Sequence, residues 1–83
     1  MSAVRDVVEV LARALTDRPD EVRVNESEHR GATIVELYVP AGELGRIVGR
    51  QGRTAAALRT LASTAGEKDG RTVTLDIREG KPA

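Results

Sequence analysis

The 83-residue chain lacks the residues on which several classes of protein depend. It contains no cysteine, which excludes disulfides, thiolate metal sites and cysteine nucleophiles. Tyr38 is its one aromatic residue, so it has no aromatic surface of the kind on which some nucleic-acid-binding sheets stack bases. No apolar run approaches the roughly 20 residues that a membrane span needs. Asp6 and Glu9 interrupt the apolar residues at the start, which therefore do not resemble a signal peptide.

The chain also lacks net charge. It has 13 basic and 13 acidic residues, so any role in binding nucleic acid must come from local clustering and not from a global field. Hydrophobic residues make up 40% and charged residues 31%, which is typical of a soluble protein. The length suits one small domain and not two.

The first half of the chain predicts one helix and two strands. Apolar residues with helical spacing predict a helix over residues 3–15; they are Val4, Val7, Val8, Leu11 and Leu15. Pro19 ends this segment, since the residue before a proline avoids helical conformation. Alternation predicts a short strand around Val22 and Val24 and a second strand over residues 33–40, with a polar turn over residues 27–32 between them.

The second half predicts two helices and a third strand. The helices are expected over residues 41–48 and 53–65, with Gly66 as the stop of the second, and the strand over residues 72–78. The order is therefore α-β-β-α-α-β. Apolar faces on strands and helices predict an α+β two-layer sandwich with a three-stranded mixed sheet. We expect a single domain over residues 1–78 and a polar, frayed tail over residues 79–83.

The segment GRIVGRQGRTAAAL, residues 45–58, breaks a helical pattern with Gly49 and Gly52. Because glycine is costly within a helix, the pattern predicts two helices joined by a Gly-Arg-Gln-Gly turn. The first amides of the second helix, at Gly52 and Arg53, are expected to be unpaired and to attract phosphate. Glycine also lacks the Cβ atom that would hold a sugar-phosphate backbone away.

Arginines surround this turn. The segment from Leu44 to Gly66 carries a charge of +4 and no acidic residue; its cations are Arg46, Arg50, Arg53 and Arg59. The turn is no Walker A loop, because arginine stands where that motif needs lysine, and the chain has no Gly-x-Gly for a Rossmann fingerprint. On its own, Gly-x-x-Gly also fits a plain tight turn. The flanking helices, the basic tip and the following strand favour a binding site.

The sequence RIVGRQGRTAAAL resembles the KH-domain signature, in which an apolar pair precedes Gly-x-x-Gly and a helix. The element order matches the type II, bacterial arrangement. Over roughly residues 4–77 the chain resembles the small bacterial single-KH RNA-binding proteins of the KhpA (YlqC) family. This resemblance implies a cytoplasmic protein that clamps about four nucleotides of single-stranded RNA and acts as a post-transcriptional regulator or RNA chaperone.

The resemblance also implies a set of site residues. The clamp would consist of Gly49, Arg50, Gln51 and Gly52. The flanking cations that would meet phosphates are Arg46 and Arg53. The apolar floor would be formed by Leu44, Ile47, Val48 and Ala55. The sheet edge and the loop over residues 27–32 would form the opposite wall. Where many KH domains have a bulky aliphatic residue this chain has Ala55, and Leu58 is the candidate to supply that volume.

The other candidate residues indicate no catalytic site. His29 is the single histidine and is read as a surface residue, with a minor RNA contact as the alternative. Tyr38 is read as ordinary packing, with base contact as the alternative. Nothing supplies a nucleophile, a base and a metal together, so we expect neither an enzyme nor a metal or cofactor. The resemblance implies a homodimer and a second, larger KH-containing partner. The alternative function is a protein-interaction adaptor that binds RNA weakly or not at all.

Overall fold

The computed structural model describes residues 3–82 and confirms the predicted α-β-β-α-α-β order. Two short 3-10 turns, η1 and η2, interrupt that order. The elements are α1 (Ala3–Leu15), η1 (Pro19–Glu21), β1 (Arg23–His29), β2 (Ala32–Val39), α2 (Leu44–Val48), η2 (Arg50–Gly52), α3 (Arg53–Lys68) and β3 (Thr72–Glu79). Within residues 3–82, none of the helices combines the length and the apolar character needed to cross a membrane.

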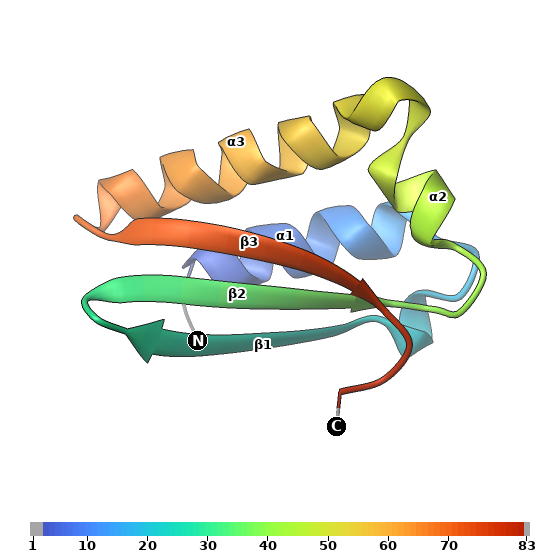
Figure 1. Ribbon diagram of the computed structural model, residues 1–83, viewed down its shortest axis with the longest axis horizontal. Helices are drawn as coiled ribbons and strands as arrows, with labels where there is room; N and C mark the ends of the chain where they lie inside the picture. Colours follow the sequence, from blue (N-terminus) through green and yellow to red (C-terminus); the bar gives the residue numbers. More distant parts are fainter. Residues whose placement is uncertain (1–2, 83) are drawn as a thin grey trace.

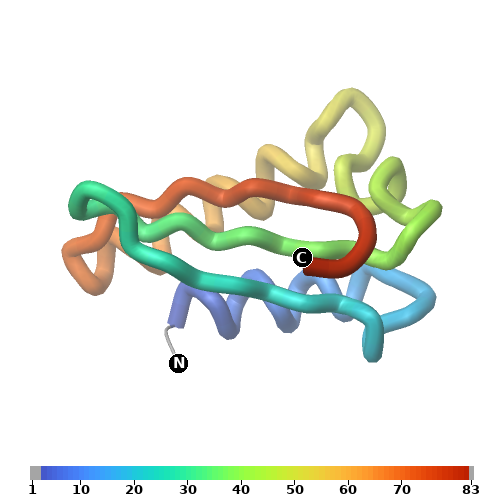
Figure 2. The backbone as a smooth tube through the Cα atoms, turned by 60° about the horizontal axis from the view of Figure 1, so that its bottom comes forward, coloured from blue at the N-terminus to red at the C-terminus, as the bar shows by residue number. Residues whose placement is uncertain are grey.

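The three strands form one mixed sheet in the order β1-β2-β3. β2 pairs with β1 in antiparallel and with β3 in parallel orientation, which makes the sheet mixed, as predicted. α1 and α3 lie on one face of this sheet, and the other face is uncovered (Figures 1 and 2). The β1–β2 hairpin and the α2–α3 junction lie at opposite ends of the sheet (Figure 1). The chain is thus the two-layer α+β sandwich that the sequence predicts.

The core fills the space between the sheet and the helices. β2 supplies Val35, Leu37 and Val39, which are fully buried, as their shared face predicts. The other apolar residues of the core cluster are Val4, Val8, Ala12, Val22, Val24, Ile47, Leu58, Ala62 and Leu75. The predicted stripe of α1 is rotated slightly in the structure: Ala12 is buried and Leu15 is exposed. The helix therefore presents its small residue to the sheet.

The predicted polar turn over residues 27–32 exists, but its predicted bounds are wrong. β1 continues to His29, and Arg30 and Gly31 alone connect it to β2. Both residues have positive φ, 52° and 82°, which is typical of a two-residue type I′ hairpin. Glu26 and Glu28 lie in β1 and pair with Arg71 at 2.8 and 2.9 Å. This cation makes acidic residues compatible with the strand.

The predicted stop of the second helix at Gly66 is also wrong, because α3 continues to Lys68. Gly66 is buried where α3 meets β3. A Cβ atom at this position would lie against the Val73 side chain and 3.1 Å from the carbonyl oxygen of Arg71. The glycine therefore permits a close approach of helix and strand instead of ending the helix. Leu61, which also lies on α3, is exposed.

The C-terminal segment is more ordered than a frayed tail. Glu79 belongs to β3, and the Gly80 amide donates a hydrogen bond of 2.9 Å to the carbonyl oxygen of Val39. The predicted domain (residues 1–78) and tail (residues 79–83) include positions 1, 2 and 83, which lie outside the described residues.

Candidate nucleic-acid interface

The Gly-x-x-Gly segment joins two helices that meet at a sharp angle (Figure 1). Gly49 has φ 80° and ψ 173°, a region that is essentially restricted to glycine. Gln51 and Gly52 follow in left-handed conformation, with φ 57° and 71°. The sequence predicted a turn here, and the structure shows that three of its four residues have positive φ.

Gly49 also meets α3 at close range. A Cβ atom built on Gly49 would lie against the Thr54 hydroxyl, 2.8 Å from the Thr54 Cβ and 3.1 Å from the Thr54 amide nitrogen. Distances below 3 Å essentially do not occur for real Cβ atoms. The first turn of α3 therefore packs directly on the first glycine, which fixes the loop against the helix. The sequence alone gave no sign of this contact with Thr54.

The expected free amides at the start of α3 are not free. The Gly52 amide donates a hydrogen bond of 3.1 Å to the carbonyl oxygen of Gly49. The Arg53 amide donates to the carbonyl oxygen of Arg50. The loop uses these two donors to close its own turn. They are therefore not available to a phosphate in this conformation, and the exposed cations become the principal attraction for an anion.

The arginines around the loop are of two kinds. Arg50, Arg53 and Arg59 are exposed, and within residues 3–82 none of the three forms an ion pair or side-chain hydrogen bond. Arg46 differs, because its Nη1 lies 2.7 Å from Oδ2 of Asp17. This contact raises the pKa of the Arg46 guanidinium above its ordinary value. The sequence from Leu44 to Gly66 contains no acidic residue, but in the folded protein one of its arginines forms an ion pair with Asp17.

The residues predicted to form the apolar floor differ in their exposure to solvent. Leu44 and Val48 are half-buried and present apolar surface beside the loop. Ile47 is fully buried in the core and Ala55 nearly so, which leaves them no surface to offer a ligand in this conformation. Leu58, the candidate for filling the volume at Ala55, belongs to the core cluster.

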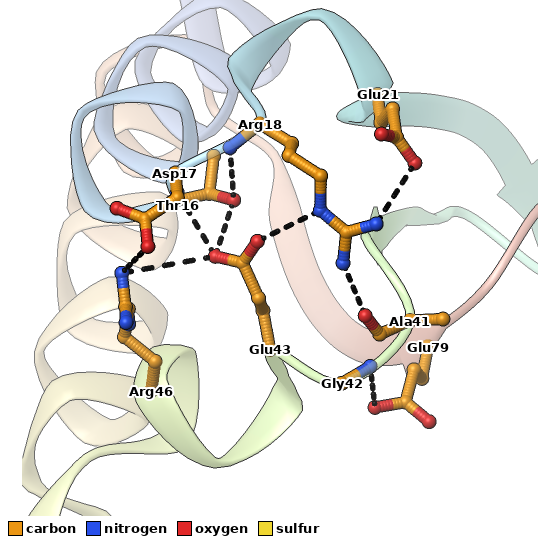
Figure 3. A network of polar contacts seen from close by, with 9 residues as sticks. All are labelled: Thr16, Asp17, Arg18, Glu21, Ala41, Gly42, Glu43, Arg46 and Glu79. Carbon is orange, nitrogen blue, oxygen red and sulfur yellow. Dashed lines mark hydrogen bonds and ion pairs between the residues drawn. The ribbon is translucent and has the colours of Figure 1, made fainter.

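Glu43 anchors the start of α2, and the sequence gave no indication of this role. Its carboxylate accepts hydrogen bonds from the Thr16 hydroxyl (2.7 Å), the Asp17 amide (2.9 Å) and Arg18 Nε (3.1 Å). Figure 3 shows Glu43 at the centre of this network, between Arg18 and Arg46. The hydrogen bond from Thr16, followed by that from the Asp17 amide, lowers the Glu43 pKa from 4.5 to about 2. The side chain is 11% exposed.

Two further contacts hold the loop that precedes α2. Arg18 Nη2 donates a hydrogen bond to the carbonyl oxygen of Ala41, and the Gly42 amide donates to Glu79 at 3.1 Å (Figure 3). The segment between β2 and α2 is thus bound to the connection after α1 on one side and to the end of β3 on the other. The base of α2 is consequently fixed by side chains from distant parts of the chain.

The structure does not bring the loop over residues 27–32 to the clamp. This hairpin lies at the end of the sheet away from the α2–α3 junction (Figure 1). β1 and β3 are the two edge strands, and β3 is the one that packs against α3. The edge beside the Gly-x-x-Gly segment is therefore that of β3. His29 is exposed at the far hairpin, and Tyr38 lies half-buried in the central strand, facing away from the helices.

A two-layer sandwich with a Gly-x-x-Gly junction between its second and third helices defines a KH fold of type II. The same fold occurs in a crystal structure of Era in complex with MgGDPNP and nucleotides 1506–1542 of 16S ribosomal RNA, with a TM-score of 0.63 and 18% identity. That match covers 92% of this chain and 29% of the Era chain. A structure of Aquifex aeolicus Era bound to GDP.AlF4- matches with a TM-score of 0.62.

The family is defined by sequence. Residues 5–77 match the family model described as KhpA/KhpB, KH domain, and the chain belongs to this family. It is 47% identical to the RNA-binding protein KhpA of Aquifex aeolicus, over 95% of this chain and 100% of the relative. It is 46% identical to KhpA of Mycobacterium tuberculosis H37Rv, over 93% of this chain and 94% of the relative. KhpA of Halalkalibacterium halodurans is 43% identical, over 89% and 97%.

Proposed function

We propose that this protein binds single-stranded RNA and clamps about four nucleotides between the Gly-x-x-Gly segment, α2, α3 and the edge of β3. The observation that carries the proposal is the exposed pair Arg50 and Arg53, which flanks the strained Gln51 between two helices and has no acidic partner within residues 3–82. The relatives named RNA-binding protein KhpA support it. An adaptor without RNA-binding activity would not require unpaired cations at this position.

In this proposal, Arg50 and Arg53 bind phosphates, and Gly52, where a Cβ atom would meet nothing within 4 Å, lets the RNA backbone approach them. Leu44 and Val48 provide the exposed part of the apolar floor. Ile47 and Ala55 support it from the core. Gln51 offers its amide to the nucleotide that passes the tip. Binding by so few cations is expected to be weak and to decrease with salt concentration.

Weak binding by a single groove gains from a second copy, since linked sites raise the apparent affinity. We therefore infer a cytoplasmic homodimer that also pairs with a second, larger KH-containing protein and acts in post-transcriptional regulation or as an RNA chaperone. The exposed large apolar side chains of the helical layer support self-association. They are Val10 (66% exposed), Leu61 (46%) and Leu15. Sedimentation of the parent protein and of Leu61→Glu tests this contact, and an unchanged state of association would exclude Leu61 from it.

The RNA-binding proposal is tested with Arg50→Asp/Gln51→Asp. A control, His29→Asp/Arg30→Asp, makes the same charge change at the exposed hairpin on the other end of the sheet. Anisotropy of a short fluorescein-labelled single-stranded RNA is measured at two salt concentrations. We expect the clamp variant to lose at least tenfold in affinity, because carboxylates at the tip repel phosphate, and the control to lose much less. Equal affinity and equal salt dependence in parent and clamp variant would refute the proposal.

A further inference from the structure

Arg46 is the one cation beside the clamp whose charge is already compensated within residues 3–82. Its Nη1 lies 2.7 Å from Asp17 and 4.0 Å from Glu43. Arg46 stands on α2, three positions before Gly49, and its side chain is 51% exposed, so it is accessible to a nucleotide that extends from the clamp along α2. Any phosphate that reaches Arg46 must therefore displace Asp17 or share the guanidinium with it.

The two acidic neighbours of Arg46 are not equivalent. Glu43 is largely buried and is occupied by the hydroxyl of Thr16, the amide of Asp17 and the guanidinium of Arg18. Asp17 is 72% exposed, and within residues 3–82 its carboxylate contacts Arg46 alone. The anchor uses only the backbone amide of Asp17. The Asp17 carboxylate is thus dispensable for the anchor, while it adds negative charge next to the candidate phosphate path.

We propose that Asp17 is an affinity-determining residue that competes with RNA phosphate for Arg46 and so weakens RNA binding. This inference rests on the proposed RNA-binding function. An exposed ion pair contributes little to stability, so the Arg46–Asp17 pair can open without harm to the fold. Once it has opened, the Asp17 carboxylate faces the incoming phosphate as a like charge. Both effects oppose binding, and both originate from one side chain outside the Gly-x-x-Gly segment.

The substitution Asp17→Asn removes the carboxylate and keeps the backbone amide that binds Glu43. Asp20→Asn is the matched control, because it makes the same charge change in the same connection and Asp20 has no ion pair within residues 3–82. Anisotropy with a short fluorescein-labelled single-stranded RNA should show about threefold tighter binding by Asp17→Asn and a smaller gain for Asp20→Asn. The slope of log affinity against log salt should steepen by about 0.7, as expected for one more phosphate contact with a single strand.

A double substitution locates the effect. In an Arg46→Gln background, Asp17→Asn should give a smaller gain than in the parent and no steeper salt slope, because it relieves the repulsion of phosphate but releases no guanidinium for phosphate. An unchanged affinity of Asp17→Asn, an equal gain from Asp20→Asn or a full gain in the Arg46→Gln background would each overturn the inference. If Asp17→Asn has no effect while Arg50→Asp/Gln51→Asp abolishes binding, this inference fails and the RNA-binding proposal stands. If the clamp variant binds like the parent, the RNA-binding proposal itself fails.

Discussion

The two ends of α2 are built in opposite ways. At its start, the Glu43 carboxylate accepts hydrogen bonds from three donors on the connection after α1, and Glu79 holds the preceding loop. At its end, the Gly-x-x-Gly segment closes its turn with its own backbone, and the side chains of Arg50 and Gln51 are exposed. One end is fastened by side chains from elsewhere in the chain, whereas the other is shaped by backbone conformation.

This difference has a physical reason. A helix of five residues is too short to be stable alone, so α2 needs external support. If that support came from the cations of the tip, they would be unavailable for phosphate. The chain instead places its support at Glu43 and leaves Arg50 and Arg53 free of acidic partners within the described part. Rigid placement of the clamp is thereby combined with unpaired charge at its tip.

The largest effect is expected from Gly49→Ala, which alters the backbone of the tip. Alanine is strained at φ 80° and ψ 173°, and its Cβ would overlap Thr54. We expect a loss of about 3 kcal/mol in the free energy of unfolding, from a glycine-only conformation and a steric clash. The same change should displace the loop from α3 and weaken RNA binding more than tenfold. Urea denaturation and RNA anisotropy measure the two effects.

Gly45→Ala is the matched control for this prediction. Gly45 lies within α2, and a Cβ atom added to it meets nothing within 4 Å. Alanine favours a helix over glycine by about 1 kcal/mol, so this variant should be as stable as the parent or slightly more stable. Equal losses from both substitutions would mean that Gly49 has no special conformational role.

The next largest loss of stability is expected from Glu43→Gln, which weakens the anchor at the start of α2. The amide of glutamine cannot replace a carboxylate that accepts from three donors, including Arg18. We expect the melting temperature at neutral pH to fall by several degrees. Glu67→Gln is the control, since Glu67 is exposed on α3 and its side chain has no ion pair within residues 3–82. A loss no larger than that of Glu67→Gln would contradict the anchoring role.

The anchor also predicts a pH dependence. The Glu43 pKa is lowered from 4.5 to about 2 in the folded protein, mainly by the hydrogen bond from Thr16. Its contribution to stability is therefore fully present above pH 4.5 and is lost as the pH falls toward 2. The difference in melting temperature between the parent and Glu43→Gln should be constant at neutral pH and should narrow over this acidic range. A difference that does not change with pH would show that the carboxylate charge is not responsible.

Most of the fold could be predicted from the sequence, because its signals are local. Alternating valines and leucines in β2 and the spacing of Val4 and Val8 indicate buried faces directly. The second half of β1 could not be predicted in this way. Glu26 and Glu28 occupy the positions where further apolar residues would be expected, and they are tolerated because Arg71, more than 40 residues away, neutralises them. The prediction that Gly66 ends the helix is wrong for a similar reason, since the contact of Gly66 with Val73 depends on the tertiary fold.

In the candidate site, too, some features could be predicted from the local sequence and others depend on tertiary contacts. The Gly-x-x-Gly turn and its exposed arginines follow from adjacent residues, so the sequence pointed to them. The partners of Arg46 could not be predicted, because Asp17 approaches from the connection after α1 and Glu43 turns toward the same connection. The burial of Ile47 beside the half-buried Leu44 and Val48 likewise depends on how α2 packs on the core. Local patterns specify the tip, and tertiary contacts specify its base.

The smallest effect on stability is expected from Gln51→Gly, and its comparison with Gln51→Val separates the backbone of the tip from its side chain. Gln51 has φ 57° and ψ 24°, which glycine adopts freely and a β-branched residue resists. Gln51→Gly relieves this strain but raises the conformational entropy of the unfolded chain. The free energy of unfolding should therefore change by no more than about 0.5 kcal/mol. Gln51→Val removes the same amide and should cost about 1–2 kcal/mol. If loop shape controls binding, RNA anisotropy will show a clear loss for valine and less than a twofold loss for glycine. Equal losses of RNA affinity in the two variants would show that binding depends on the Gln51 side chain and not on the backbone conformation of the tip.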